Sequence, residues 1–332
     1  MRLLVLGGTV FVSYATAAEA VRRGHDVVCA ARGTSGKVPD GAKLVVVDRD
    51  APDGLEPLAG ERFDAVVDVA KISYPWVERA LDVLGDHAGH WTFVSSVSAY
   101  ADETTKGQRP DAPMLAPKRE HVSADEEIID PKLYGSIKVA SENAVRERLG
   151  DRAFVVRPGL ITGPGDGTDR FGYWPARMAR GGRVLVPDAP EQPSQFIDVR
   201  DFAAWIVTAA EQRLAGTFDA ISEPVPLPEV LAGIADAVGA GDLELVAAAQ
   251  QALTEAKVTY WSGPRSLPLW LPPSYHGMGA HDPTPSIDNG LRIRPVADAA
   301  VGALEHERAL GLDRDRRAGL SPAEEAEVLA GL

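Results

Sequence analysis

Short apolar runs alternate with helical patterns through the first half of the chain. The runs are rich in β-branched residues and have the length of buried parallel strands. They occupy Leu3–Leu6, Asp26–Ala31, Leu44–Val47, Ala65–Val69 and Trp91–Ser95. Helical periodicity lies between them at Ala15–Arg23 and Trp76–Leu84. The alternation predicts an α/β fold with a doubly wound parallel sheet of the Rossmann type.

The sheet is expected to continue, because Ala153–Arg157 has the pattern of a further strand and Phe196–Arg200 that of a return segment before a helix from about Asp201. Gly163–Pro193 and about Pro224–Leu332 differ from the rest in being rich in Pro, Gly, Trp and Arg. We therefore expect a dinucleotide-binding domain and a smaller, discontinuous C-terminal substrate lobe. The domain comprises residues 1–165 and 194–223, and the lobe comprises residues 166–193 and 224–332.

Three stretches have a less specific pattern. Tyr260–Pro273 combines aromatic residues with prolines and is either a rigid cover for a pocket or a packed subunit contact. The Ala-rich, charged tail after Pro295 is expected to form surface helices. The acidic segment Ser123–Glu127 is expected to be a solvated loop.

Composition narrows the class of protein. The 332 residues are 45% hydrophobic, and 34 basic against 48 acidic residues give a net charge of −14. That charge argues against nucleic acid and acidic membranes as partners and favours a small-molecule substrate. Cys29 stands alone, so we expect neither an internal disulfide nor a multi-cysteine metal site. The N-terminus is too short for a signal-peptide core and no run of 18 apolar residues occurs, so we expect a cytoplasmic protein.

Gly7 and Gly8 follow the first strand and predict a turn that binds a diphosphate. The usual Gly-x-x-Gly-x-x-Gly fingerprint is incomplete, because Val10 and Ser13 occupy its second and third glycine positions. The turn and the N–H groups of the following helix still suit a diphosphate, to which Thr9 or Ser13 would add a hydroxyl. Val10 is expected to narrow this space. The alternative is a strand-to-helix turn without a ligand.

The end of the second strand bears on the choice of cofactor. Ala31 stands where an acid would hold the ribose of NAD, and Arg32 follows, with Lys37 nearby. A guanidinium there favours the 2′-phosphate of NADP, although NAD stays open and Arg32 alone could be a solvated charge. Asp48 is placed to accept a hydrogen bond from adenine with Arg49 backing it, or else to cap a helix.

Tyr134 and Lys138 suggest hydride chemistry. Residues four apart share a helix face, so the ammonium lies near the phenol and favours the phenolate form, which can exchange a proton with an alcohol or carbonyl. The alternative is a solvated lysine beside a half-buried aromatic ring.

These features together resemble the extended short-chain dehydrogenase/reductase superfamily, in its NAD-dependent epimerase/dehydratase group, across most of the chain. Phe93–Tyr100 is similar to the segment that carries the family's catalytic Ser or Thr, which selects Ser96. Arg157–Gly165, Gln195–Asp201 and Ser286–Pro295 are similar to three later family segments. The opening Gly-Gly-Thr-x-Phe is most similar to an atypical branch that includes chloroplast stem-loop RNA-binding proteins.

The resemblance implies a role for each catalytic residue. Tyr134 would be the general acid/base, Ser96 would hydrogen-bond the reacting oxygen, and Lys138 would lower the tyrosine pKa and hold the nicotinamide ribose. Val97 and Ser98 stand where the family's dehydratases carry an Asp-Glu pair, so dehydration by that route is not expected.

The expected cofactor-binding residues are Gly7, Gly8, Thr9, Phe11, Val12, Arg32, Asp48, Arg49, Val69, Ala70, Lys71, Ser95, Tyr134, Lys138, Pro158, Gly159 and Leu160. Lys71 would line the pocket as a cation for an acidic substrate, or be a surface lysine at a strand end. Further pocket candidates, each with an equal packing explanation, are Tyr173, Trp174, Arg177, Gln195, Trp261, Trp270 and His276.

Three functions remain in view. The first is an NADP-preferring oxidoreductase that reduces a carbonyl or oxidises an alcohol on a small molecule. The second is a sugar-nucleotide-type epimerase that retains its cofactor, and the third is a non-catalytic RNA- or ligand-binding protein. The resemblance also implies a homodimer.

Overall fold

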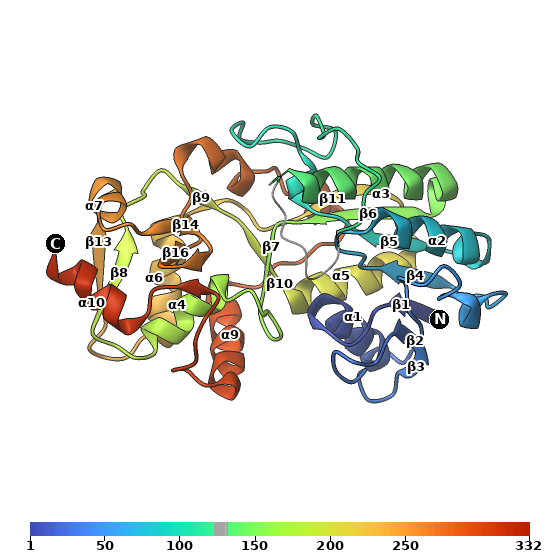
Figure 1. The fold of residues 1–332 in the computed structure, drawn as a ribbon, viewed down its shortest axis with the longest axis horizontal. Coiled ribbons are helices and arrows are strands. Elements are labelled where there is room, and N and C mark those ends of the chain that lie inside the picture. The colour runs from blue at the N-terminus through green and yellow to red at the C-terminus, as the bar shows by residue number, and fades with distance from the viewer. Residues whose placement is uncertain (123–129, 131) are drawn as a thin grey trace.

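The computed structural model describes residues 1–122, 130 and 132–332, so the acidic segment Ser123–Glu127 lies outside the described residues. In the described part of the chain, a seven-stranded parallel sheet has the order β11-β6-β5-β4-β1-β2-β3 (Figure 1). Its strands are β1 (Arg2–Leu6), β2 (Asp26–Ala31), β3 (Lys43–Val46), β4 (Ala65–Asp68), β5 (Trp91–Val94), β6 (Ala153–Pro158) and β11 (Gly216–Ala220). The Rossmann-type α/β fold is confirmed.

Helices cover both faces of the sheet, as its alternating apolar side chains require. Leu3 and Val5 of β1 pack with α1 (Phe11–Arg22) and α5 (Val199–Gln212) on one face. Leu4 and Leu6 pack on the other face, whose core also contains residues of α2 (Tyr74–Leu84) and α3 (Leu133–Leu149). Continuous apolar strands are therefore the signature of a sheet that is buried on both sides.

The order of strands reverses beside β1. β2 and β3 lie on one side of β1, whereas β4, β5 and β6 lie on the other. In such sheets ligands bind outside the carboxyl ends of the strands at this reversal. Gly7, Val69, Ser95 and Gly159 each follow the end of one of these strands, so the topology brings them to one edge.

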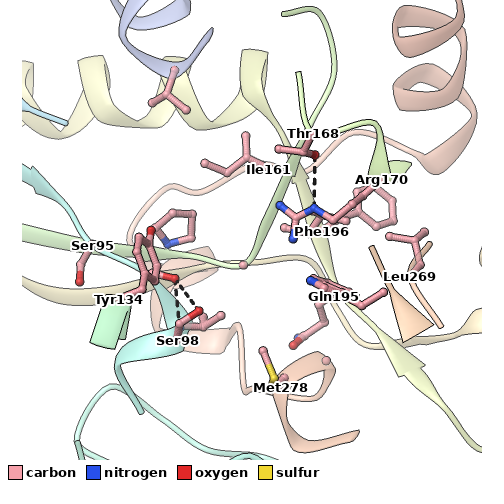
Figure 2. A pocket seen from close by; sticks show the side chains of 18 of the residues that line it. Ser95, Ser98, Tyr134, Ile161, Thr168, Arg170, Gln195, Phe196, Leu269 and Met278 are labelled. Carbon is pink, nitrogen blue, oxygen red and sulfur yellow. Dashed lines mark hydrogen bonds between the residues drawn. The ribbon is translucent and has the colours of Figure 1, made fainter. Parts of the chain in front are cut away.

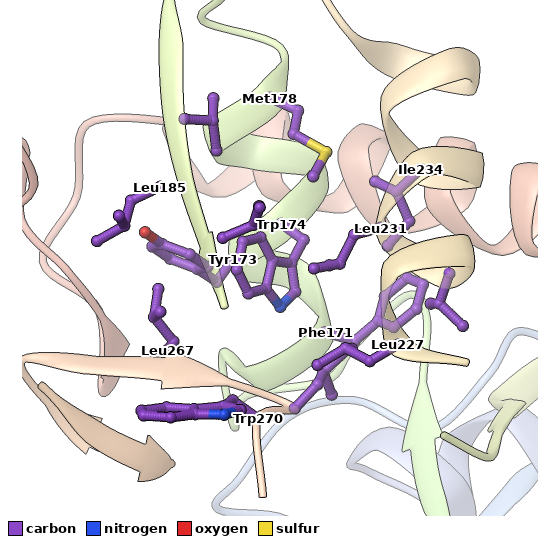
Figure 3. Packing of buried hydrophobic residues seen from close by; sticks show 14 of the residues in the cluster. Phe171, Tyr173, Trp174, Met178, Leu185, Leu227, Leu231, Ile234, Leu267 and Trp270 are labelled. Atoms are coloured by element: carbon purple, nitrogen blue, oxygen red, sulfur yellow. The ribbon is translucent and has the colours of Figure 1, made fainter. Parts of the chain in front are cut away.

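A second part of the molecule lies beside the sheet (Figure 1). It is built around α4 (Arg170–Met178), α6 (Leu227–Val238) and α9 (Val296–Leu310). Its core includes Phe171, Trp174, Met178 and Trp270, all buried (Figure 3). The smaller elements are β8 (Arg183–Pro187) paired with β13 (Glu244–Ala248), β14 (Thr259–Trp261) with β16 (Ser266–Pro268), β15 (Gly263–Pro264) with β17 (Ala318–Gly319), α7 (Gln250–Glu255) and α10 (Pro322–Ala330).

Short strands connect the two parts. β7 (Leu160–Thr162) pairs in parallel with β10 (Phe196–Asp198), and β9 (Pro193–Ser194) pairs with β12 (Val225–Pro226). Helix α8 (Thr284–Asp288) packs near β11, where the Ser286 hydroxyl donates to the Asp219 carbonyl at 2.6 Å. The chain therefore crosses between the parts several times.

Two expectations need correction. Helix α1 begins at Phe11 rather than Ala15, because the Tyr14 N–H already bonds the Val10 carbonyl. The tail is not formed by surface helices alone, because α9 buries Ala299, Ala300 and other residues in the core around Trp174. Alanine is small enough to allow close helix packing, and the composition of the tail alone does not show whether its alanines are buried.

Candidate active site

The turn after β1 requires glycine at two positions. Gly7 and Gly8 have φ of +132° and +112°. A Cβ at Gly8 would lie 2.4 Å from the Cys29 Sγ, and one at Gly7 would lie 2.9 Å from the Ser13 Cβ. The backbone of the turn therefore lies too close to β2 and α1 for a side chain at either position.

Val10 and Ser13 have separate places in this turn. The Val10 side chain is 53% exposed and lines neither of the cavities described below. Ser13 is buried, and its hydroxyl donates to the Val10 carbonyl at 2.7 Å. The N–H groups in the first turn of α1 have no carbonyl to bond within the helix, so they remain available to an anion. The turn thus fits the diphosphate of a dinucleotide.

We expect Gly8→Ala to destabilise the fold by about 1–3 kcal/mol, because the new Cβ would overlap Cys29 in a packed core. Gly24→Ala is a matched control, since Gly24 also has positive φ, +83°, but a Cβ there would contact nothing within 4 Å. Thermal unfolding of both variants would measure the difference. Equal losses would mean that backbone strain, not the contact with Cys29, governs the site.

A smaller cavity of about 190 Å³ lies between the ends of β1, β2 and β4. Of the expected cofactor residues it is lined by Gly7, Thr9, Arg32, Asp48, Arg49, Val69 and Ala70. Arg32 is 56% exposed and lies 3.9 Å from Asp50, and no acidic side chain follows β2 directly. The position suits the adenosine half of a dinucleotide.

Arg49 does not back Asp48, so that part of the prediction is wrong. Its guanidinium is buried and donates to both carboxylate oxygens of Asp68, at 2.8 and 3.1 Å, and to the Trp76 carbonyl. Asp48 is exposed and accepts the N–H of Asp50, which makes a turn rather than a helix cap. Neighbouring side chains after a strand point in opposite directions, which separates the two residues.

The main cavity, of about 460 Å³, lies where the edge of the sheet meets the second part of the molecule (Figure 2). From the sheet side it is lined by the expected residues Phe11, Val12, Val69, Lys71, Ser95, Ser96, Tyr134, Lys138, Pro158, Gly159 and Leu160. Gly8 lines neither cavity. The structure thus brings the three expected catalytic residues to one space.

Tyr134 and Lys138 lie on the face of α3 that meets this cavity. The Lys138 ammonium lies 5.7 Å from the centre of the Tyr134 ring and donates to the carbonyls of Ala70 and Val94, at 2.5 and 2.7 Å. Ser96 follows β5, and its hydroxyl accepts the N–H of Ser98 at 3.1 Å. The two carbonyl bonds fix the position of the lysine side chain.

Burial dominates the electrostatics of the pair. It raises the pKa of Tyr134, although a hydrogen bond from Ser96 and the charge of Arg170 act to lower it. It lowers the pKa of Lys138 to about 7, against the opposing effect of Asp68 and Glu142. The pKa of Tyr134 is therefore raised overall, and the expectation that Lys138 lowers it stays a prediction.

A buried polar network supports the floor of the cavity. The Ser95 hydroxyl donates to Glu142, and Arg157 donates to both oxygens of Glu142, at 2.9 and 2.7 Å. Arg157 also donates to the Tyr100 hydroxyl at 2.8 Å, which in turn donates to Asp219 at 2.7 Å. Burial raises the pKa of Glu142, but the bonds from Arg157 and Ser95 hold it below its usual value.

Only some of the pocket candidates from the sequence line the far wall of the main cavity, which faces the sheet edge. Gln195 and Trp261 line the cavity, as do Leu269 and Leu271, so the Tyr260–Pro273 segment does cover a pocket. The other candidates do not line it. Tyr173, Trp174 and Trp270 are buried in the neighbouring core, Arg177 pairs with Glu325, and His276 lies outside the lining.

Several lining residues were not anticipated. Arg170, Thr168 and Met278 come from loops and element ends far apart in the sequence. None belongs to a periodic pattern. Only the Arg-rich character of Gly163–Pro193 hinted at Arg170.

Among residues 1–122, 130 and 132–332, no group of three or more His, Cys, Asp or Glu side chains has a geometry that would hold a metal ion. Within the same residues, no helix is long and apolar enough to cross a membrane.

Comparison with known proteins supports the fold. No curated protein matches the chain. Among solved structures, UDP-N-acetylglucosamine 4-epimerase from Bacillus cereus is 16% identical with a TM-score of 0.67, covering 96% of this chain and 100% of that one. UDP-glucose 4-epimerase from Thermus thermophilus, in complex with NAD, is 19% identical with a TM-score of 0.64, covering 94% and 100%.

A family comparison goes further than the structural one. Residues 3–220 match the NAD dependent epimerase/dehydratase family, a stretch that runs from β1 to the last strand of the sheet. It includes the glycine turn, Ser96, Tyr134 and Lys138. The chain therefore belongs to the NAD-dependent epimerase/dehydratase family.

Proposed function

We propose that this protein is an oxidoreductase of the short-chain dehydrogenase/reductase type that reduces a carbonyl or oxidises an alcohol on a small molecule. The observation that carries the proposal is the convergence of Ser96, Tyr134 and Lys138 on one cavity beside the glycine turn. The cofactor, when bound, supplies or accepts the hydride.

In the direction of reduction, Tyr134 acts as the proton donor. Its raised pKa keeps the phenol neutral at neutral pH, so it has a proton to give to the substrate oxygen. The Ser96 hydroxyl donates a hydrogen bond to the same oxygen and holds it against the phenol. As the proton leaves, the Lys138 ammonium stabilises the growing phenolate.

We propose that the cofactor is NADP in preference to NAD. Support comes from Arg32, which lies at the edge of the smaller cavity where the chain has no acid after β2. Its exposed guanidinium is able to make bidentate contacts to a 2′-phosphate. NAD remains open, since the structural relative from Thermus thermophilus was solved with it.

Titration with NADPH and, separately, with NADH tests this proposal. We expect the wild type to bind NADPH more tightly, on the order of tenfold, and Arg32→Ala to bind both alike. Arg183→Ala is the control, because Arg183 is also exposed but lies in β8, away from both cavities. Equal affinities in the wild type would contradict the preference, and binding of neither nucleotide would contradict the oxidoreductase itself.

A second candidate is an epimerase that returns the hydride to the same substrate, which the family's description favours. Protein purified with firmly retained cofactor would support it, whereas ready exchange with added NADPH would support the reductase. We propose residues 166–193 and 224–332 as the substrate lobe. A homodimer and a cytoplasmic location stay predictions.

A further inference from the structure

Arg170 opens helix α4 and points into the main cavity (Figure 2). Its guanidinium carbon lies 5.0 Å from the centre of the Trp261 ring, which lines the same wall. Its Nε donates to the Thr168 hydroxyl at 3.2 Å. The ring and the hydroxyl orient the side chain, and its two terminal nitrogens form no hydrogen bond with the part of the chain that the structure describes.

Arg170 is half-buried, and no carboxylate in the described part of the chain compensates its charge as one does for the fully buried guanidinium groups. Arg49, Arg157 and Arg177 each bind a buried carboxylate, on Asp68, Glu142 and Glu325. Among the described residues, no carboxylate lies within 4.0 Å of Arg170.

Buried charges are normally paired, because an unpaired one loses its hydration without return. Burial lowers the pKa of Arg170, although the charge of Asp166 acts to raise it. Asp166 forms no ion pair with Arg170, so the guanidinium can still bind an anion directly.

The cavity as a whole has the opposite sign from the protein. Lys71, Lys138 and Arg170 line it, and no Asp or Glu does so within the described part of the chain. The chain carries a net charge of −14. Positive lining in an acidic protein concentrates anions at the site while the rest of the surface repels them.

The three cations differ in what remains available to a substrate. Lys138 donates to two backbone carbonyls and serves Tyr134. Lys71 follows the end of β4 on the cofactor side, two residues beyond Val69. The polar side chain of Gln195 also lines the cavity (Figure 2), but its amide already forms hydrogen bonds with the backbone of Ser222 and His281. Arg170 is thus the cation that a substrate would meet opposite Tyr134.

We infer that the site takes a small carbonyl or alcohol compound that bears a carboxylate or a phosphate, and that Arg170 binds this anionic group while the reacting oxygen lies at Tyr134 and Ser96. The inference rests on the proposed function for the reaction, but the anion site is a binding property of its own. The planar guanidinium matches either anion bidentately. Trp261 holds the guanidinium in position from its face.

A binding experiment tests the anion site without turnover. Calorimetric titration of the full chain with benzoate, phenyl phosphate and benzamide compares two anions with a neutral compound of the same shape. We expect benzoate or phenyl phosphate to bind on the order of tenfold more tightly than benzamide, and Arg170→Gln to abolish the difference. Arg170→Lys should keep part of it, and the exposed Arg183→Gln should keep all of it.

Equal binding of all three probes to the wild type would overturn the inference, whether or not the variants fold. The probes also separate the two anions, since a carboxylate site favours benzoate and a phosphate site favours phenyl phosphate. NADPH affinity must be measured alongside, because Phe11 and Val12 of the glycine turn line the same cavity. A loss of NADPH affinity in Arg170→Gln, with unchanged benzoate binding, would assign Arg170 to the cofactor and overturn the inference.

Turnover then connects the anion site with the reaction. We expect 4-carboxybenzaldehyde or 4-formylphenyl phosphate to be reduced with a higher kcat/KM than methyl 4-formylbenzoate, and Arg170→Gln to remove the preference through KM. Selective anion binding without reduction of any aldehyde would leave the anion site standing and count against the proposed reaction. Reduction without preference for an anion would sustain the reaction and overturn the anion site.

Discussion

Tyr134→Phe is expected to lower kcat/KM for carbonyl reduction by about 10²–10⁴-fold, because it removes the proton donor together with its hydrogen bond from Ser96. The ring keeps its place on α3, so the packing against Lys138 is unchanged. Since the raised pKa keeps the phenol protonated, the lost hydroxyl is the acid that the reduction needs. Steady-state kinetics with NADPH would measure the loss.

The controls for this variant separate chemistry from binding. NADPH affinity and thermal stability should stay close to those of the wild type. Tyr275→Phe should leave kcat/KM unchanged, because Tyr275 is exposed and does not line the cavity. A Tyr134→Phe enzyme that retained most of its activity would show that another group supplies the proton, and the proposed role of Tyr134 would have to be abandoned.

Arg157→Met should produce the largest loss of stability, about 3–5 kcal/mol, because it leaves the Glu142 carboxylate buried without its principal partner. The partly exposed Arg146 remains 3.0 Å from Glu142 and moderates the effect. Chemical denaturation of wild type and variant would measure it. Arg148→Met is the surface comparison, since Arg148 pairs with Asp86 where both are exposed, and little change is expected there.

The loss in Arg157→Met should depend on pH in a defined direction. In the wild type the lowered pKa of Glu142 means that the pair stabilises the fold above the carboxyl's unfolded pKa, and that this stability is lost as pH falls through the folded pKa. Without Arg157, burial raises the pKa of Glu142. As pH falls, Glu142 in the variant therefore becomes protonated, which removes the cost of a buried charge without its main partner. The difference from wild type should therefore be smaller at pH 5 than at pH 8. A constant difference would indicate lost packing rather than an uncompensated charge.

The sequence predicted six of the seven strands of the sheet because each of these six is a local signal, whereas β11 was missed. A run such as Asp26–Ala31 has the composition and length of a buried strand whatever surrounds it, and the structure has that strand at the same residues. The pairing of Tyr134 with Lys138 could be predicted equally well, since helical spacing alone places them on one face of α3.

The far wall of the cavity could not be predicted in the same way. Arg170, Phe196, Leu269 and Met278 meet only because the chain returns several times, and no spacing connects them. Arg49 shows the same limit within a few residues. Its sequence neighbour is Asp48, but its partner Asp68 ends β4, which β1 and β2 separate from β3 in the sheet. Long-range pairing of charges depends on topology, which local patterns do not contain.

The discontinuous build of the second part of the molecule has a consequence for its synthesis. Helix α4 emerges from the ribosome roughly 130 residues before the end of α9, against which it packs. At about 5–20 residues per second, the core around Phe171, Trp174 and Met178 lacks α9 for on the order of ten seconds, although β8 and α6 are already synthesised. During that time the sheet can close with β11 while the side of α4 that packs against α9 stays uncovered.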